Sequence, residues 1–189
     1  MDVAPGTVLL ANRAHEGDSD ALNELLAELR PLVVQTARLI VGSGSWSAED
    51  AAQEALLDIS RGISTLRDPA AVRIWAVRIA TRRALKMERR ERFLRIRSAP
   101  TSLEELQADG PTEGREAVLK QAFDLLPPRL RATAVLRLQA GLSEEETAAA
   151  LGCSLGAVKS NLHDARRRLT KSLTQAGHTP TVRQEEARA

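Results

Sequence analysis

The chain has 189 residues, and its 27 Lys and Arg side chains against 25 Asp and Glu give a formal net charge of +2, which points to no class of partner. Aromatic residues make up 2% of the sequence and helix-forming residues dominate it, so we expect packed helices rather than sheets. A single cysteine excludes an internal disulfide, and three scattered histidines give no metal-ligand spacing. The sequence has neither an apolar run long enough to span a bilayer nor the pattern of a signal peptide, so we expect a soluble, cytoplasmic protein without membrane contact.

Two helices are predicted before the first loop. The helical pattern becomes regular over residues 8–15, and Asp18 can cap a second helix whose leucines recur on one side. Because proline removes a backbone N–H and clashes with the preceding turn, we expect a kink or short break at Pro31. The apolar face then continues to Val41, and a flexible loop is predicted for residues 42–45.

The next predicted helix begins at Ser47, which can form a capping box with Asp50. Its alanines mark a buried side. The opposite side, here called the docking face, consists of Glu49, Asp50, Gln53, Glu54 and Leu57. Acidic residues beside an exposed leucine suit docking onto a basic partner surface, although a solvated acidic face is the commoner arrangement.

A metal site is a further interpretation of this helix. Asp50, Glu54 and Asp58 recur at four-residue spacing, and stacked carboxylates of this kind ligate Mg²⁺ in some helical hydrolases. Such sites need a second carboxylate set on a facing helix, which the sequence lacks. We therefore predict neither a metal nor a cofactor.

A long basic helix is predicted after Asp68, the expected cap, with Pro69 at its first position. Residues 61–97 contain twelve Arg and Lys side chains and only three Asp and Glu. One side of the helix carries small residues, and another carries an aromatic ring at the head of a line of cations. This line, here called the basic row, consists of Trp75, Arg78, Arg82, Lys86 and Arg89. It can grip phosphates and stack on an unpaired base, although Trp75 fits a core position equally well.

The composition changes at residues 98–114, where two prolines, two glycines and acidic charge predict a flexible linker. The predicted fold is therefore all-α, with two small helical domains at residues 1–97 and 115–173 and a disordered tail at 174–189. The second domain is expected to contain a helix-turn-helix. Before it, a helix is predicted with Leu130, Ala134, Val135 and Leu138 facing inward.

Residues 142–169 predict the helix-turn-helix itself, two short helices joined by a sharp turn. Ser143 and Glu146 can form a capping box at the start of the first helix. Ala148 and Leu151 are expected to form its inner face.

The second helix follows Gly152, where a chain leaving a helix needs a left-handed residue, and Ser154 can cap it. Its buried stripe is predicted to be Val158, Leu162, Ala165 and Leu169. Its outer side, here called the reading face, consists of Lys159, Ser160, Asn161, His163, Arg166 and Arg167. Many helical hairpins with a polar face bind nothing, but the cap, the glycine turn and the basic run occur together here and favour insertion into a major groove.

Three stretches of the chain read SAEDAAQEALLDI, RDPAAVRIWAVRIATRRAL and LPPRLRATAVLRLQAGLSEEETAAALGCSLGAVKSNLHDARRRL. In these stretches, in their order and in their separation by a linker, the chain resembles the extracytoplasmic-function sigma factors of bacteria. The resemblance covers residues 17–90 and 126–169. It implies a subunit that directs RNA polymerase to promoters without chemistry of its own, and that lies on the nucleoid when bound to polymerase.

The resemblance also implies a role for each surface. The docking face would bind the clamp helices of the largest polymerase subunit, and the basic row would engage the −10 element of promoter DNA and hold the melted non-template strand. The linker would thread towards the active centre. The helix-turn-helix would read the −35 element from Ser154 onward, with Arg166 and Arg167 nearest the phosphates and the rest of the reading face nearest the bases. An anti-sigma factor is a common partner in this family, although nothing in the sequence identifies one.

Two departures from the family pattern matter. Arg82 and Lys86 stand where Asn and Asp are common, which favours phosphate gripping over base reading at the −10 element. Asn161 stands where Ser, Thr or Arg is more usual, so analogy predicts no −35 sequence. Two rival functions stay open: a stand-alone helix-turn-helix regulator that binds duplex DNA without polymerase, and a metal-dependent nucleotide hydrolase built on Asp50, Glu54 and Asp58.

Overall fold

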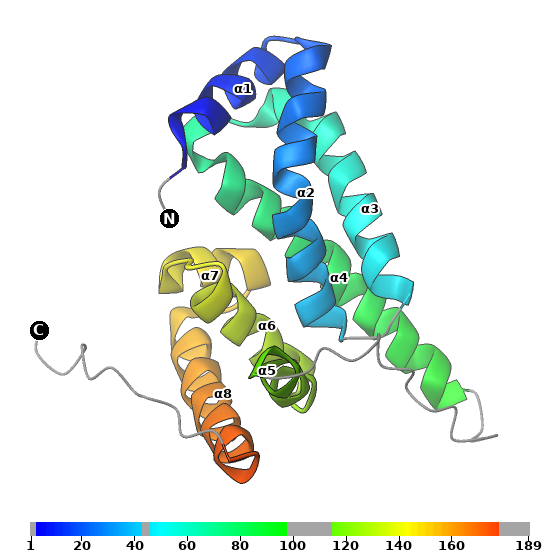
Figure 1. Cartoon of the computed structure of the whole chain (residues 1–189), viewed down its shortest axis with the longest axis vertical. Helices are drawn as coiled ribbons and strands as arrows, with labels where there is room; N and C mark the ends of the chain where they lie inside the picture. Colours follow the sequence, from blue (N-terminus) through cyan, green and yellow to red (C-terminus); the bar gives the residue numbers. More distant parts are fainter. Residues whose placement is uncertain (1–2, 43–45, 98–114, 178–189) are drawn as a thin grey trace, which may run out of the picture.

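The computed structural model describes residues 3–42, 46–97 and 115–177, and every regular element in these ranges is helical (Figure 1). The N-terminal domain contains α1 (Pro5–His15), α2 (Ser19–Val41), α3 (Trp46–Gly62) and α4 (Val72–Arg97), with single 3₁₀ turns at Ile63–Thr65 and Pro69–Ala71. The C-terminal domain contains α5 (Arg115–Asp124), α6 (Pro128–Ala134), a π-helical turn (Val135–Gln139), α7 (Glu144–Leu151) and α8 (Leu155–Gln175). The predicted all-α, two-domain class is confirmed. The predicted linker, residues 98–114, lies outside the described residues, as do residues 178–189 of the predicted tail.

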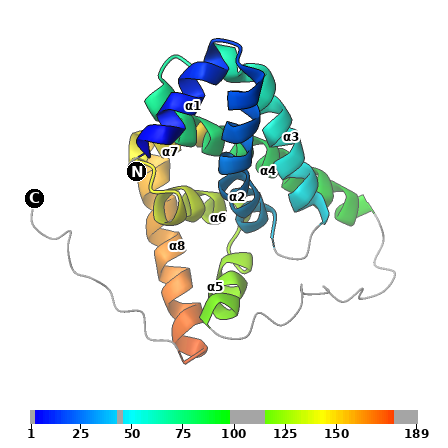
Figure 2. The ribbon, with the colours of Figure 1, turned by 45° about the horizontal axis from the view of Figure 1, so that its top comes forward.

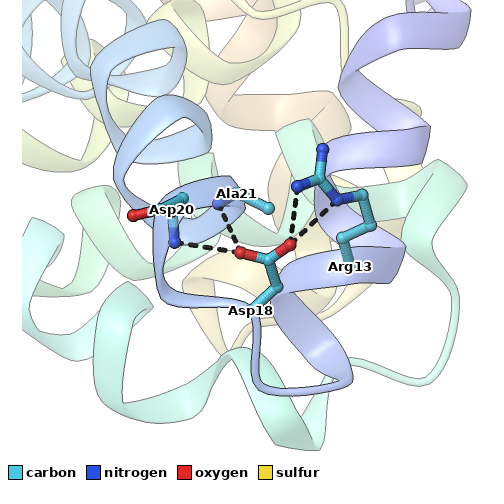
Figure 3. A network of polar contacts seen from close by, with 4 residues as sticks. All are labelled: Arg13, Asp18, Asp20 and Ala21. Carbon is cyan, nitrogen blue, oxygen red and sulfur yellow. Dashed lines mark hydrogen bonds and ion pairs between the residues drawn. The ribbon is translucent and has the colours of Figure 1, made fainter.

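The joint between α1 and α2 depends on one carboxylate (Figure 3). Asp18 is the N-cap of α2, as predicted, and its Oδ1 accepts hydrogen bonds of 3.0 Å from the backbone N–H groups of Asp20 and Ala21. Its Oδ2 accepts two more, from Nε and Nη2 of Arg13 at 2.9 and 2.6 Å. The Ala21 N–H and then the Arg13 guanidinium hold the pKa of Asp18 below its usual range, so the carboxylate remains ionised and the joint persists at neutral pH.

Helix α2 continues through Pro31 to Val41, so the alternative of a short break is wrong. Leu25, Leu29 and Val33, on both sides of the proline, are completely buried in the core. Proline inside a helix costs about 3 kcal/mol, but burial of each large aliphatic side chain contributes roughly 1.5–3 kcal/mol. Burial on both sides therefore offsets the local penalty.

Helices α2, α3 and α4 pack closely because α3 and α4 carry rows of alanine. The predicted small-residue rows are confirmed, and their members are at most 2% exposed: Ala48, Ala51, Ala52 and Ala55 on α3, and Ala76, Ala80 and Ala84 on α4. The predicted cap of α3 needs correction. The helix already includes Trp46, so Ser47 lies within its first turn. Serines also stand at positions 43 and 45, and capping preference alone does not choose among them.

A π-helical turn changes which side chains of the C-terminal domain are buried. Leu138 was expected to face inward but is 47% exposed, whereas Leu136 is completely buried. Each turn of a π-helix contains an additional residue, so the side chains after Val135 rotate away from the positions that a 3.6-residue period predicts. At the other end of the domain, α8 extends to Gln175, so the first two residues of the predicted tail are helical.

The two domains pack against each other, with α6 and α7 beside α2 and α4 (Figure 1, Figure 2). Arg131 of α6 is only 7% exposed and donates a hydrogen bond from Nη2 to the carbonyl of Val41 at 3.3 Å. Its Nη1 donates to the carbonyl of Asp124 at 3.5 Å. Val41 is the last residue of α2, where carbonyl groups lack partners within the helix and a cation is favoured. A side chain of the C-terminal domain therefore caps a helix of the N-terminal domain.

An apolar cluster completes this interface. Val77 of α4 packs with Leu136, Ala140, Leu142 and Ala150, all at most 8% exposed. These residues come from α4, from the π-helical turn and the segment after it, and from α7. The first helix of the helix-turn-helix and the segment that precedes it therefore both pack on the basic helix α4.

Replacing Arg131 with Met should loosen this interface, because the Val41 carbonyl loses its donor, at a cost of about 1–3 kcal/mol. We expect faster amide hydrogen exchange in α6 and at the end of α2, and a larger radius of gyration in X-ray scattering. Arg129→Met, an exposed arginine of the same helix, is the matched control and should change neither quantity. Equal exchange in the two variants would contradict the bridge.

Candidate nucleic-acid interface

Local hydrogen bonds build the helix-turn-helix as predicted. The backbone N–H of Glu146 donates to Oγ of Ser143 at 3.1 Å, and the N–H of Ser143 donates to the Glu146 carboxylate at 2.7 Å. Gly152 has φ 61° and ψ 44°, the left-handed conformation that ends α7. Oγ of Ser154 then accepts from the N–H of Ala157 at 3.2 Å and caps α8. The angle between the two helices therefore follows from residues that lie within a few positions of each other.

The inner face of α7 is wider than predicted. Leu151 is half-buried and packs against both core clusters, as expected, and Ala148 is half-buried, whereas Thr147 and Ala150 are buried more completely. Ala150 belongs to the cluster around Val77 of α4. Because α7 packs against the N-terminal domain as well as against α8, its buried side depends on a contact that the helix-turn-helix sequence does not encode.

The reading face is exposed on α8, and the predicted apolar stripe of this helix is buried. Lys159, Ser160, His163, Arg166 and Arg167 are exposed, and Asn161 is half-buried. Two of these cations have acidic neighbours that the sequence analysis did not identify.

These acidic neighbours decide which cations are available. Nζ of Lys159 lies 3.6 Å from the carboxylate of Glu144 on α7, and Nη2 of Arg167 lies 3.2 Å from that of Asp164. Arg166 forms no ion pair with any residue that the structure describes. It is therefore the arginine of this face most available to a phosphate.

A pocket of about 380 Å³ lies between the end of α3, the turn that follows it, and α4. Trp75, Arg82 and Lys86 line it from α4, and Gly62 lines it from α3. A β-carbon at Gly62 would lie 3.3 Å from the Trp75 ring, so the absence of a side chain there lets the ring lie against the backbone. Trp75 is half-buried: one part packs on the core and another lines the pocket.

The structure thus brings together three of the five residues of the basic row. Arg89 is exposed on α4 one turn beyond the pocket. Arg78 is half-buried outside it, and its Nε is buried without a hydrogen-bond partner in the described part of the chain. The pocket therefore combines an aromatic ring with two exposed cations, Arg82 and Lys86.

One residue of the pocket, Arg83, was missed by the sequence analysis. Its Nε and Nη2 donate to the two carboxylate oxygens of Asp58 at 2.5 and 2.6 Å, and its Nη1 donates to Glu54 at 2.8 Å. The hydrogen bonds from Arg83 hold the pKa of Asp58 below its usual range. Asp58 therefore remains ionised, and bound to Arg83, throughout the neutral pH range.

The docking face is only partly free. Glu49 accepts hydrogen bonds of 2.9 and 2.6 Å from Arg38 of α2, and Glu54 binds Arg83. Asp50, Gln53 and Leu57 are exposed at the centre of the face, and Leu57 is 47% exposed. A partner would meet two polar side chains and one aliphatic side chain flanked by ion pairs.

The described residues also bear on the metal hypothesis. Within residues 3–42, 46–97 and 115–177, no three His, Cys, Asp or Glu side chains are grouped so that they could hold a metal ion. Two of the three stacked carboxylates bind the Arg83 guanidinium instead. In the same ranges, no helix has the length and apolar character needed to cross a membrane.

Family comparisons match both domains. Residues 25–93 match the model of sigma-70 region 2, and residues 116–169 match the model of sigma-70 region 4. Together these matches cover more than half of the chain, and they include the docking face, the basic row and the reading face.

Individual relatives agree with these matches. The ECF RNA polymerase sigma factor SigD of Mycobacterium tuberculosis is 32% identical, over 94% of this chain and 92% of the relative, and SigE of Mycolicibacterium smegmatis is 30% identical, over 92% and 70%. The sigma factor RpoE of Bartonella quintana, solved with the anti-sigma factor NepR, has the same fold, with a TM-score of 0.67 and 23% identity over 80% of this chain and 96% of that chain. CnrH, solved with the cytosolic domain of CnrY, has a TM-score of 0.62 and 23% identity over 90% and 98%. The chain belongs to the extracytoplasmic-function family of RNA polymerase sigma factors.

Proposed function

We propose that this sigma factor divides promoter recognition between its domains, with residues 1–97 binding polymerase and the −10 element and residues 115–173 binding the −35 element. The observation that carries the proposal is the pocket of about 380 Å³ beside Trp75, where an aromatic ring and the cations Arg82 and Lys86 meet. Stacking surfaces next to cations are how proteins hold unpaired bases. A regulator that reads only duplex DNA has no need of such a pocket.

At the −35 element, α8 enters the major groove with its reading face towards the bases. Ser154 caps the helix, so it lies at the end from which recognition helices contact base edges. Ser160, Asn161 and His163 supply hydrogen-bonding groups. Arg166, which forms no ion pair within the described part of the chain, contacts a phosphate, while Lys159 must exchange Glu144 for the DNA.

At the −10 element, an unpaired base of the non-template strand stacks beside Trp75. Arg82 and Lys86 hold the flanking phosphates, and Arg89 extends the cationic track along α4. Arg78 is half-buried and does not line the pocket, so it has a smaller part in this contact than Arg82 and Lys86.

Polymerase binds the docking face. Asp50, Gln53 and Leu57 form an exposed centre, and the clamp helices of the largest subunit are the partner that the family implies. The paired residues Glu49 and Glu54 form the edge of the interface, where their ion pairs orient them.

Promoter binding requires the two domains to separate. Elements centred at −35 and −10 are about 25 base pairs, roughly 85 Å, apart along duplex DNA. The observed packing, in which Arg131 bonds to Val41 and α7 rests on α4, holds the two DNA-binding surfaces on one compact body. We therefore assign this arrangement to the free protein and an open one to the promoter complex.

A second protein partner, an anti-sigma factor, fits a groove of about 860 Å³ between α2 and α5. Pro31, Val34 and Leu39 line the groove from α2, and Leu119 and Phe123 line it from α5. RpoE of Bartonella quintana, which has the same fold, was solved with an anti-sigma factor, which supports this class of partner. A segment bound there would contact both domains and stabilise their closed packing.

Sigma factors are transcription initiation factors, and we propose that this one has no catalytic activity of its own. The hydrolase alternative needs Asp50, Glu54 and Asp58 to share a metal ion. The carboxylates of Glu54 and Asp58 instead form ion pairs with Arg83. A protein that works on polymerase and chromosomal DNA acts in the cytoplasm, on the nucleoid.

Transcription reconstituted from core polymerase, this protein and genomic fragments tests the proposal. Initiation at defined promoters that depends on the protein is the expected result. Tight, sequence-specific operator binding by the protein alone, without protein-dependent initiation, would instead establish the stand-alone regulator.

Two substitutions on α8 should separate phosphate contacts from base contacts. Arg166→Ala should weaken holoenzyme binding to all −35 sequences alike, and the slope of log K against log salt concentration should become smaller by about 1. Lys159→Ala should instead reduce the preference for the correct −35 element over other sequences, by up to about ten-fold. Lys171→Ala, an exposed change near the end of the same helix, is the control. Binding titrations at several salt concentrations give both quantities, and sequence-dependent effects at Arg166 would refute its assignment to phosphate.

Removing the polar centre of the docking face should weaken assembly with polymerase. We expect Asp50→Ala with Gln53→Ala to raise the Kd for core polymerase by about ten-fold or more, a typical cost of truncating central interface residues. Asn23→Ala with Glu24→Ala, an exposed amide and carboxylate on α2, is the matched control. Affinity can be measured by fluorescence anisotropy, and circular dichroism checks the fold. An unchanged Kd would rule out this face.

A further inference from the structure

Arg83 connects the α3 and α4 walls of the pocket beside Trp75. It extends from α4 and binds both oxygens of Asp58 on α3, at 2.5 and 2.6 Å, and one oxygen of Glu54, at 2.8 Å. Its side chain is 27% exposed, and those of Asp58 and Glu54 are 30% and 47% exposed. A planar guanidinium with two parallel bonds to one carboxylate restricts distance and orientation together, which a single lysine contact does not.

The charge balance argues against a phosphate-binding role for Arg83. All three of its nitrogens donate to carboxylates, so one positive charge faces two negative ones. Its neighbours in the pocket, Arg82 and Lys86, are exposed and form no ion pair with any described residue. The electrostatic attraction for DNA therefore comes from these neighbours, and Arg83 has a different task.

The position of Asp58 indicates that task. Asp58 lies one helical turn before Gly62, the residue whose backbone lies against the Trp75 ring. The hydroxyl of Thr65 donates to the carbonyl of Gly62 at 2.7 Å and joins the following turn to the same wall. Any shift of Asp58 relative to Arg83 therefore moves Gly62 and Thr65 relative to Trp75, and changes the width of the space that a base must enter.

We propose that Arg83 is a positioning residue for −10 capture: its bidentate bond to Asp58 sets the separation of the α3 and α4 walls of the pocket. The inference rests on the proposed role of this pocket in holding an unpaired base. Small errors in the position of a binding group are costly, since a displacement of about 1 Å can reduce a rate by about a hundred-fold. The additional bond to Glu54 connects the same wall to the edge of the docking face.

The test uses promoters that the wild-type holoenzyme opens, with permanganate reactivity of unpaired thymines as the measure of opening. Arg83→Lys retains the charge but loses the bidentate bond, and we expect it to lower the opening equilibrium by about ten-fold, or 1.4 kcal/mol. The matched control is Arg38→Lys. It weakens the hydrogen bonds between Arg38 of α2 and Glu49 of α3, which lie outside the pocket, so holoenzyme with this variant should open promoters normally. Arg83→Lys also disturbs the ion pair to Glu54 at the edge of the docking face, so any rise in the Kd for core polymerase should be no larger than in the Arg38→Lys control. The melting temperature of the free protein should show that the variant stays folded under the assay conditions.

A second variant keeps the test valid if Arg83→Lys fails to fold. Asp58→Asn leaves Arg83 in place and weakens the bidentate bond, so it should also reduce opening, while the double exchange Arg83→Asp with Asp58→Arg should restore part of it. Normal opening in Arg83→Lys, or a loss of opening matched by an equal loss of core affinity, would overturn the inference. If the wild-type holoenzyme opens no promoter, the proposed function fails and the inference with it.

Discussion

The close approach of α2, α3 and α4 is the constraint on which the functional surfaces depend. Alanine rows on α3 and α4, at most 2% exposed, let the helix backbones approach because they occupy little volume between them. The acidic side of α3 and the basic side of α4 are thereby brought within reach of each other, and Arg83 can bond to Asp58 across the joint. Bulkier residues in these rows would separate the helices and widen the pocket beside Trp75. The packing of the smallest side chains thus brings the partners of the most polar site within reach of each other, and the proposed role of the Arg83 bond is to fix their final separation.

Features that depend on neighbouring residues were predictable from the sequence. The caps at Asp18, Ser143 and Ser154 are present, and Asp68 caps the 3₁₀ turn that leads into α4 and not α4 itself. In each cap the donor and acceptor lie within three residues of each other. The cap predicted at Ser47 is the exception, because several serines stand close together before α3. The other errors occurred where the local pattern does not decide the outcome. Helix α2 passes through Pro31 because core burial on both sides stabilises it, and α7 buries Thr147 and Ala150 because it packs on another domain. Leu138 was misplaced because nothing in the local pattern identifies a π-helical turn.

The candidate site was predictable to the same extent. Helical periodicity correctly placed most of the docking and reading faces on the surface, and it grouped Trp75 with Arg82 and Lys86. It could not distinguish free charges from paired ones where the partner lies on another helix. Glu49, Glu54 and Lys159 were treated as equivalent to their neighbours, although each has an ion-pair partner on another helix. The alternatives for Trp75 were both partly correct, since a large ring can pack on the core and line a pocket at the same time.

The contact between the domains has an energetic consequence for promoter recognition. The buried Arg131 bond and the Val77 cluster stabilise the packing of the two domains. Under the proposed division of labour, both are lost when the domains separate to reach two distant DNA elements. When the free protein binds DNA without polymerase, its DNA contacts alone must supply this free energy. Its apparent affinity is then the affinity of the open form multiplied by the fraction of molecules that are open. On the same proposal, polymerase binds the docking face of one domain and also contacts the promoter DNA, and these contacts contribute part of the free energy needed to separate the domains. Under the proposed division of labour, the same interface that compacts the free sigma factor makes promoter binding depend on assembly with polymerase.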